Sequence, residues 1–136
     1  LGAKTMCVKA DWMLAWSSIF CALMWVPYIL ARIMAWGALE AMSYPKNPPP
    51  VPEWAQRAQK AHANMIESLA PFAAIVLTAH VADVSNSTTE LGALLFLVGR
   101  GIHYPVYIAK IPVARTLAFA VAWLGTVLIF LQLSNA

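Results

Sequence analysis

Polar and ionisable residues recur at helical spacing in a segment that leads into an apolar stretch. Arg57, Lys60, Asn64 and Glu67 are three, four and three positions apart, so a helix would carry them on one face. The apolar sequence FAAIVLTAHV follows almost at once. A carboxylate at the edge of an apolar span is costly unless it meets other protein groups, so this face is predicted to turn toward the interior of a helical bundle.

A second polar face lies in the sequence GRGIHYPVY. Arg100, His103 and Tyr107 stand there at positions i, i+3 and i+7 of one helix. Arg100 is near the middle of an apolar segment, where an arginine costs about 2.5–3.5 kcal/mol on insertion scales. Arg115 and Thr116 come at the start of the last apolar segment. The two faces and this pair are therefore predicted to line one shared cleft.

The predicted cleft holds several cations and hydrogen-bond donors but one carboxylate. Its members are Lys60, Asn64, Glu67, Arg100, His103, Tyr107 and Arg115. Such a cleft suits a small zwitterionic ligand that carries more than one carboxylate. Two simpler interpretations stay open: Glu67 and Arg100 form a structural pair between helices, and Arg57 and Lys60 lie at lipid headgroups. No metal site is predicted, and the scattered basic residues predict no nucleic-acid partner.

The elements that must position these residues are membrane-spanning helices. Of the 136 residues, 61% are hydrophobic and only 11% are charged, whereas soluble domains have about a quarter charged residues. A helix needs about 20 residues to cross the bilayer core. The apolar segments predict spans at 12–36, 54–83, 91–109 and 113–133. We therefore expect residues 1–136 to form one all-α domain, a bundle of four transmembrane helices in contact with membrane lipids.

Prolines and turn-forming residues mark the breaks and connections. Pro27 is expected to kink the first span, which lacks a small-residue cleavage site and is expected to be retained. The sequence SYPKNPPPVPEW predicts a stiff, polyproline-like connection. The sequence DVSNSTTE, at 83–90, predicts a turn-rich loop.

Basic residues near the span ends predict the orientation. The side with the Pro-rich connection and the third connection carries Arg32, Lys46, Arg57, Lys60, Lys110 and Arg115. The side with both termini and the second connection carries Lys4 and Lys9. The Pro-rich connection is therefore predicted to be cytoplasmic. A bacterial inner membrane and the endoplasmic reticulum both fit this pattern.

Two stretches carry a resemblance to a known family. RAQKAHANMIESLAPF resembles the second-helix signature of the MAPEG family, the membrane-associated proteins in eicosanoid and glutathione metabolism. That signature is roughly R-A-x-x-A-H-x-N-x-x-E-x-x-x-P-F. LFLVGRGIHYPVYIAKIPVARTLAF resembles the third and fourth helices, where R-x-x-H-x-x-x-Y precedes an Arg-Ser or Arg-Thr pair. Order and spacing agree over about 54–119.

The resemblance implies a left-handed four-helix bundle that assembles as a homotrimer. It also implies that glutathione lies between neighbouring subunits near the cytoplasmic face. Carried over by position, Asn64 and Glu67 would hold the glutamyl end of glutathione. Arg100, His103 and Tyr107 would lie along the rest of the tripeptide.

In the enzymatic members of the family, the pair that matches Arg115 and Thr116 faces the thiol of glutathione. A free thiol has a pKa of about 8.5, so little thiolate exists at pH 7. A guanidinium favours the thiolate, and a hydroxyl can donate a hydrogen bond to it. The resemblance thus implies a glutathione transferase or peroxidase whose lipophilic electrophile or hydroperoxide arrives from the bilayer.

One position departs from the pattern of the enzymes. Several catalytic members carry an arginine just before the asparagine of the signature, where this chain has Ala63. Lys60, one turn earlier, is the candidate replacement, although lysine lacks the bidentate fork of arginine. The family also includes a member without catalysis. Catalysis therefore stays open, and the alternatives are a lipid-binding scaffold or accessory subunit of a larger membrane complex, and a small transporter or channel subunit.

Overall fold

The structure is a computed structural model that describes the backbone of residues 2–136 and the side chains of residues 9–136. The side chain of Lys4, which entered the orientation count, lies outside the described residues. The helices of the described chain are α1 (Gly2–Leu23), α2 (Trp25–Trp36), α3 (Ala38–Ala41), α4 (Glu53–Val81), α5 (Ser87–Ile108) and α6 (Pro112–Ser134).

Four stretches of the described chain are long and apolar enough to cross a membrane. They are Lys9–Trp36, Glu53–Val81, Ser87–Ile108 and Pro112–Ser134. Large apolar side chains also cover the outside of the bundle, among them Trp16, Leu117 and Val113. Lipid tails solvate such a surface, whereas water does not. The chain is therefore an integral, multi-pass membrane protein, as its composition predicts.

The predicted kink in the first span is confirmed. Helix α1 ends at Leu23 and α2 begins at Trp25. Pro27 has no backbone N–H, and its ring would collide with the carbonyl four positions earlier, which belongs to Leu23. The hydroxyl of Tyr104 on α5 donates a 2.7 Å hydrogen bond to the carbonyl oxygen of Met24. The break is thus tied to the neighbouring helix.

The prediction of a loop over 83–90 is wrong at its second half. Helix α5 starts at Ser87, four residues before the predicted span. The side chain of Asn86 accepts a hydrogen bond from the amide of Thr89, and Thr89 Oγ1 accepts one from the amide of Asn86. This reciprocal capping box starts the helix inside a sequence whose composition favours turns.

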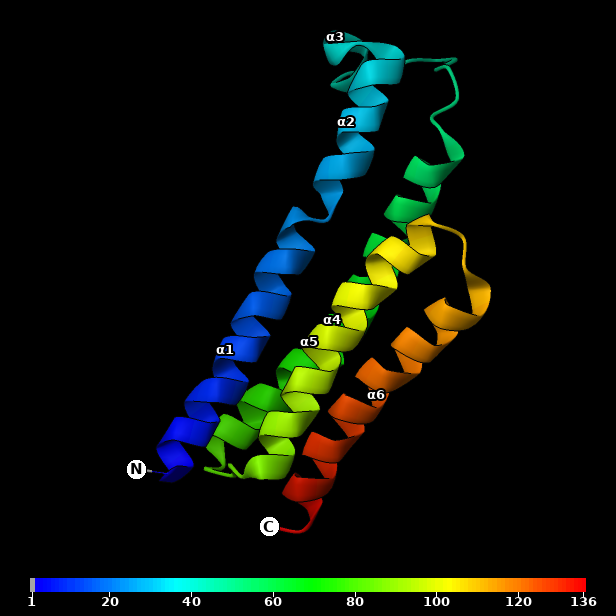
Figure 1. The fold of residues 1–136 in the computed structure, drawn as a ribbon. Helices are drawn as coiled ribbons and strands as arrows, with labels where there is room; N and C mark the ends of the chain where they lie inside the picture. The colour runs from blue at the N-terminus through cyan, green and yellow to red at the C-terminus, as the bar shows by residue number, and fades with distance from the viewer. Residues whose placement is uncertain (1) are drawn as a thin grey trace.

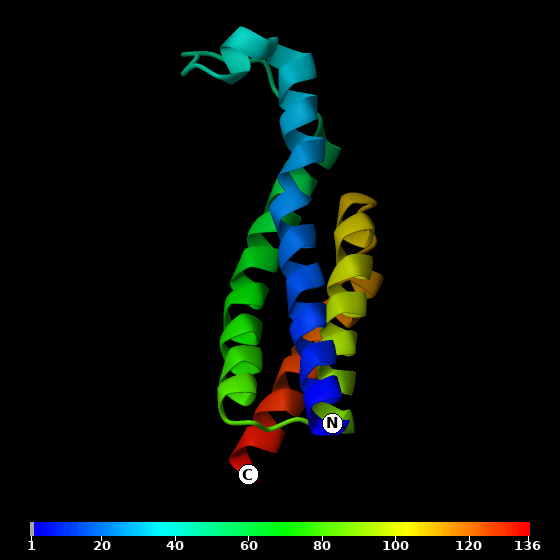
Figure 2. The ribbon, with the colours of Figure 1, turned by 90° about the vertical axis from the view of Figure 1, so that its left-hand side faces the viewer.

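The four spans alternate in direction along the bundle (Figure 1). The α5–α6 turn, α3 and the Pro-rich connection therefore lie at one end, opposite both chain termini. Helix α1 packs on α5 and α4, α2 packs on α4, and α6 packs mainly on α5. Seen from the side, α1 and α2 form one long bent rod in front of α4 and α5 (Figure 2).

Small residues bring α5 and α6 unusually close together. A Cβ atom added to Gly92 would lie 2.5 Å from the backbone oxygen of Gly125 on α6. A Cβ atom added to Gly99 would lie 2.9 Å from the oxygen of Ala118. Glycine and alanine allow such approach between membrane helices, where packing rather than water exclusion holds them together. This seam fixes how α6 is placed against α5.

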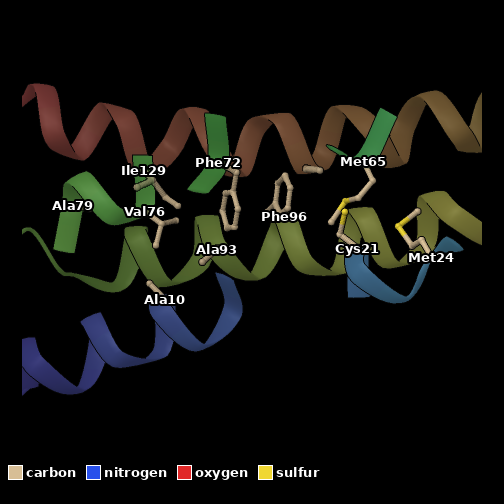
Figure 3. Packing of buried hydrophobic residues seen from close by; sticks show 11 residues of the cluster. Ala10, Cys21, Met24, Met65, Phe72, Val76, Ala79, Ala93, Phe96 and Ile129 are labelled. Carbon is tan, nitrogen blue, oxygen red and sulfur yellow. The ribbon is translucent and has the colours of Figure 1, made fainter. Parts of the chain in front are cut away.

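Two aromatic rings occupy the middle of the core. The rings of Phe72 on α4 and Phe96 on α5 stack with centroids 3.8 Å apart and planes 6° from parallel. Met65, Cys21 and Met24 lie on one side of this stack, and Val76, Ala79, Ile129 and Ala10 lie on the other (Figure 3). The apolar core therefore runs along the whole bundle, and the polar faces must open elsewhere.

Candidate functional site

Three neighbouring cavities lie along the interface between α4 and α6. Their volumes are about 310, 340 and 280 Å³. The first and second share Asn64 and Phe119, and the second and third share Tyr107 and Arg115. Shared walls make the three cavities one groove, which runs from the middle of the bundle to the end with the α5–α6 turn. We name them the inner, central and end cavities, in that order.

The central cavity gathers polar side chains from three helices. Asn64 comes from α4, His103 and Tyr107 come from α5, and Arg115, Thr116 and Phe119 come from α6. Five of the six were predicted from the sequence to lie in one cleft. The α5–α6 seam holds two of these helices close together, while α4 supplies the opposite wall.

Aromatic contacts hold two of these side chains in place. The guanidinium carbon of Arg115 lies 4.8 Å from the ring centroid of Tyr107, a cation–π arrangement. The ring of His103 lies 5.4 Å from the same ring. His103 is buried, and its Nδ1 makes no hydrogen bond with any described residue. The hydroxyl of Thr116 donates to the carbonyl oxygen of Pro112 at 3.0 Å.

Arg100 lies behind the cavity rather than in its wall. Its residue exposure is 1%, and Nη1 donates a 2.9 Å hydrogen bond to Oδ1 of Asn64. Its Nε and Nη2 make no hydrogen bond with any described residue. A charged donor fixes an amide more firmly than a neutral one does. Arg100 therefore orients Asn64, whose side chain reaches both the inner and the central cavity.

The interpretation that Glu67 pairs with Arg100 is wrong. No ion pair joins them among the described side chains, and Arg100 bonds to Asn64 instead. Glu67 is exposed and lines the inner cavity. The carboxylate is thus tolerated because it opens into a cavity rather than because a buried cation neutralises it.

The inner cavity is mostly apolar. Besides Asn64 and Glu67, its walls are Ser68, Pro71, Phe96, Phe119, Ala122, Trp123 and Thr126. The groove therefore changes character along its length, from cations and hydroxyls at one end to aromatic and aliphatic groups at the other. Such a groove can hold a polar molecule beside a lipophilic one.

Two further residues of α4, Lys60 and His62, do not line the groove. Lys60 is exposed on α4 and does not line any of the three cavities. Its role in binding stays a prediction. His62, on the other side of α4, forms a 2.8 Å hydrogen bond through Nδ1 with the hydroxyl of Tyr28 on α2. His62 therefore joins two helices and does not enter the groove.

The sequence interpretation missed one wall of the groove. Phe119, Trp123 and Thr126 continue from Arg115 and Thr116 at intervals of three and four positions along α6. Such spacing defines one helix face, so the signal was present. It was hidden because apolar residues occupy every face of a membrane span. Arg57 and Lys110 line the end cavity. Arg57 was placed on the polar face of its helix but not among the residues of the cleft, and Lys110 was counted only for orientation.

Comparison with known proteins identifies the chain at the level of a family. The model of the MAPEG family matches residues 13–134, nearly the whole chain. No curated protein matches the sequence. No solved structure matches it either.

Proposed function

We propose that this chain, which belongs to the MAPEG family, binds glutathione in the groove between α4 and α6. The bound glutathione is transferred to a lipophilic compound from the membrane or is used to reduce such a compound. The observation that carries the proposal is the central cavity. It combines a guanidinium, a hydroxyl, an amide and an imidazole at the polar end of a groove that continues into an apolar cavity.

The residues present fit glutathione. Its carboxylates and amides need several donors, and the groove offers Arg115, Tyr107 and the amide of Asn64. The unpaired Nδ1 of buried His103 supplies one more polar contact on the same wall. A buried polar atom without a hydrogen-bond partner raises the free energy of the protein. A ligand group that bonds to such an atom therefore gains more binding free energy than it would at an exposed atom.

Each polar residue has a defined task in this proposal. When bound, glutathione supplies a thiol that can act as a nucleophile. Arg115 lowers the pKa of that thiol by placing a positive charge beside it. Thr116 rotates its hydroxyl from the Pro112 carbonyl to donate to the sulfur. Arg100 is a positioning residue, since it holds Asn64 in the orientation that presents its amide to the ligand.

The inner cavity supplies the place for the lipophilic substrate. Phe119 lines both it and the central cavity, so a molecule in one would lie next to a molecule in the other. Binding two reactants side by side accelerates their reaction by removing the entropic cost of bringing them together. Access from lipid suits electrophiles and hydroperoxides that dissolve poorly in water.

A second function rests on Ala63. This position carries no charge, although several enzymes of the family have an arginine there. Without that carboxylate clamp, the same groove would serve a non-catalytic protein that binds lipids or docks on a larger membrane complex. The two functions differ in one measurable property, which is whether bound glutathione becomes ionised near neutral pH.

Glutathione binding to the protein in mild detergent tests the proposal. Isothermal calorimetry should detect binding, and ultraviolet absorbance should reveal thiolate well below pH 8. Methylation of the glutathione sulfur should leave binding in place and remove the absorbance change. Binding without ionisation would favour the non-catalytic function, whereas no binding at all would refute the proposal.

A further inference from the structure

The end cavity has features that the proposed glutathione site does not use. Its volume is about 280 Å³, and its walls are Arg57, Tyr107, Lys110, Ile111, Pro112 and Arg115. Tyr107 and Arg115 also line the central cavity. Arg57, Lys110 and the α5–α6 turn do not, and they form a separate cationic rim at the end of the bundle.

The backbone of the turn places Lys110 on this rim. Lys110 has a φ of 63°, in the left-handed region that residues other than glycine rarely adopt. The amide of Ile111 then bonds to the carbonyl oxygen of Val106 at 3.2 Å, which closes the end of α5. The turn is therefore defined by hydrogen bonds, and Lys110 takes part in the cavity wall through a fixed backbone.

Arg57 reaches the rim from the start of α4. Its Nε donates to the carbonyl oxygen of Ile108 at 2.9 Å, which anchors the guanidinium on the end of α5. Its Nη1 lies 3.8 Å from the carboxylate of Glu53, whose side chain is 86% exposed. A pair this long and this exposed to solvent neutralises little charge. Together with Lys110 and Arg115, these side chains give the end cavity three cations and one exposed carboxylate, so the cavity is strongly positive.

The first turn of α6 adds to the positive field. Pro112 is the first residue of this helix, and no side chain caps its N-terminus. The amides of the first turn and the helix dipole favour an anion at this position. The anchored cations and this helix terminus meet in the same cavity. A phosphate group matches this set of donors better than a neutral ligand does.

Exposed apolar side chains flank the same turn. Ile111 is 47% exposed and Val113 is 70% exposed. The end cavity therefore combines a cationic pocket with an adjacent exposed apolar surface. It lies at the bundle end that the basic residues predict to be cytoplasmic. A phospholipid has both parts, an anionic headgroup and acyl chains. Basic pockets between membrane helices on that side are suited to such headgroups.

We propose that the end cavity binds the phosphate of an anionic phospholipid headgroup through Arg57 and Lys110. Free phosphate shares the headgroup chemistry, but it gains nothing from Ile111 and Val113. Bound lipid would lie at the open end of the groove, next to the central cavity. Arg57 and Lys110 have no task in the proposed glutathione site, so the test is made without glutathione.

Lipid binding in detergent micelles, followed by native mass spectrometry, tests the proposal. The probes are dioleoylphosphatidylglycerol, dioleoylphosphatidylcholine and inorganic phosphate. Phosphatidylglycerol should bind at least tenfold more tightly than phosphatidylcholine. Lys110→Glu should weaken phosphatidylglycerol binding about 30-fold. One basic residue near an anionic surface raises the affinity about fivefold, and a charge reversal both removes this gain and adds a repulsion of similar size.

Lys46→Glu is the matched control. It makes the same charge reversal on the exposed Pro-rich connection, outside the cavity. Its phosphatidylglycerol affinity should stay within about threefold of the wild type. Arg57→Gln should weaken binding in the same direction as Lys110→Glu, and the melting temperature of each variant reports whether it is folded.

Three results would overturn the lipid site. One is equal affinity for the two lipids, and another is equal loss in Lys46→Glu and Lys110→Glu. The third is binding of inorganic phosphate as tight as that of phosphatidylglycerol, which would assign the pocket to free phosphate. None of these results bears on glutathione binding in the central cavity, so the two proposals fail separately.

Discussion

Arg100 and Asn64 join α5 to α4 through a 2.9 Å hydrogen bond in the interior of the bundle. Arg100 is buried to 1% exposure, and this is the hydrogen bond that its side chain makes with the described residues. A buried guanidinium with so few partners is a cost to stability, which is usually accepted at functional sites. The bond therefore links the stability of the bundle to the shape of the candidate site.

Asn64→Ala should destabilise the protein by about 1.5–3 kcal/mol, because it removes the acceptor of a charged hydrogen bond inside the bundle. Reversible unfolding in mixed micelles measures the change. Asn64→Asp is the informative companion, since a carboxylate would pair with Arg100 and should restore most of the lost stability. Asn47→Ala, on the exposed connection, should have no effect. An unchanged stability in Asn64→Ala would show that the bond contributes nothing.

Gly92→Ala should destabilise the α5–α6 seam by about 1–3 kcal/mol, as expected for overpacking. The added methyl group would lie 2.5 Å from the backbone oxygen of Gly125, and a backbone atom cannot move aside cheaply. Gly101→Ala is the matched control on the same helix, because nothing lies within 4 Å of its added Cβ. That variant should be neutral or up to about 1 kcal/mol more stable, since alanine favours helix. Similar effects of the two substitutions would contradict the role of the seam.

Arg115→Gln should raise the pKa of the bound glutathione thiol by about 1–3 units, because a positive charge is lost beside a group that ionises to a negative one. The conjugation rate with an aryl halide should then fall at pH 7 and recover partly as the pH rises through the new pKa. Arg115→Lys keeps the charge and should lie between wild type and Arg115→Gln. A pH profile that does not move would remove Arg115 from thiolate stabilisation.

Thr116→Val should slow the same reaction by about 100-fold with little change in the KM for glutathione, which is typical of losing one donor to a developing negative charge. The substitution keeps the shape of the side chain and removes its hydroxyl. Thr116→Ser keeps the hydroxyl and should retain most of the activity. Equal activity in the valine and serine variants would mean that the hydroxyl only serves the Pro112 carbonyl.

Ala63→Arg should tighten glutathione binding roughly tenfold, the gain expected from one charge-assisted hydrogen bond to a carboxylate. The position precedes Asn64 and is exposed on α4, so a longer side chain has room. Ala63→Leu adds bulk without charge and should leave the affinity unchanged. If Ala63→Arg and Ala63→Leu change the affinity for glutathione equally, an arginine at this position does not contribute a charge-assisted bond to the ligand.

The sequence predicted five of the six residues of the central cavity but not their pairing. The spacing of Arg100, His103 and Tyr107 places them on one face of α5, and the structure brings two of them into the cavity wall. Spacing along one helix carries no information about which neighbour a side chain meets. For that reason, a pair between Glu67 and Arg100 stayed open, while the bond goes to Asn64, one turn earlier on α4.

Local chemistry explains the differences in the helix ends. Composition marked 83–90 as a loop because serine, threonine and asparagine favour turns, yet the same residues cap helices. Asn86 and Thr89 form such a cap, so α5 starts early. Pro27 was interpreted correctly because its ring collides with the carbonyl of Leu23 in a regular helix. Pro71 and Pro105 show that such a break does not follow at every proline, since α4 and α5 continue past them.

The stacked rings of Phe72 and Phe96 divide the polar groups of the bundle into two sets. Asn64, Arg100 and His103 lie on the side of the stack nearer the α5–α6 turn. The 2.8 Å contact between Nδ1 of His80 and the carboxylate of Asp11 lies on the other side, toward the termini. Proton conduction needs an unbroken chain of hydrogen bonds, and two buried aromatic rings offer none. The stacked rings themselves therefore provide no hydrogen bond that would connect one set of described polar groups to the other.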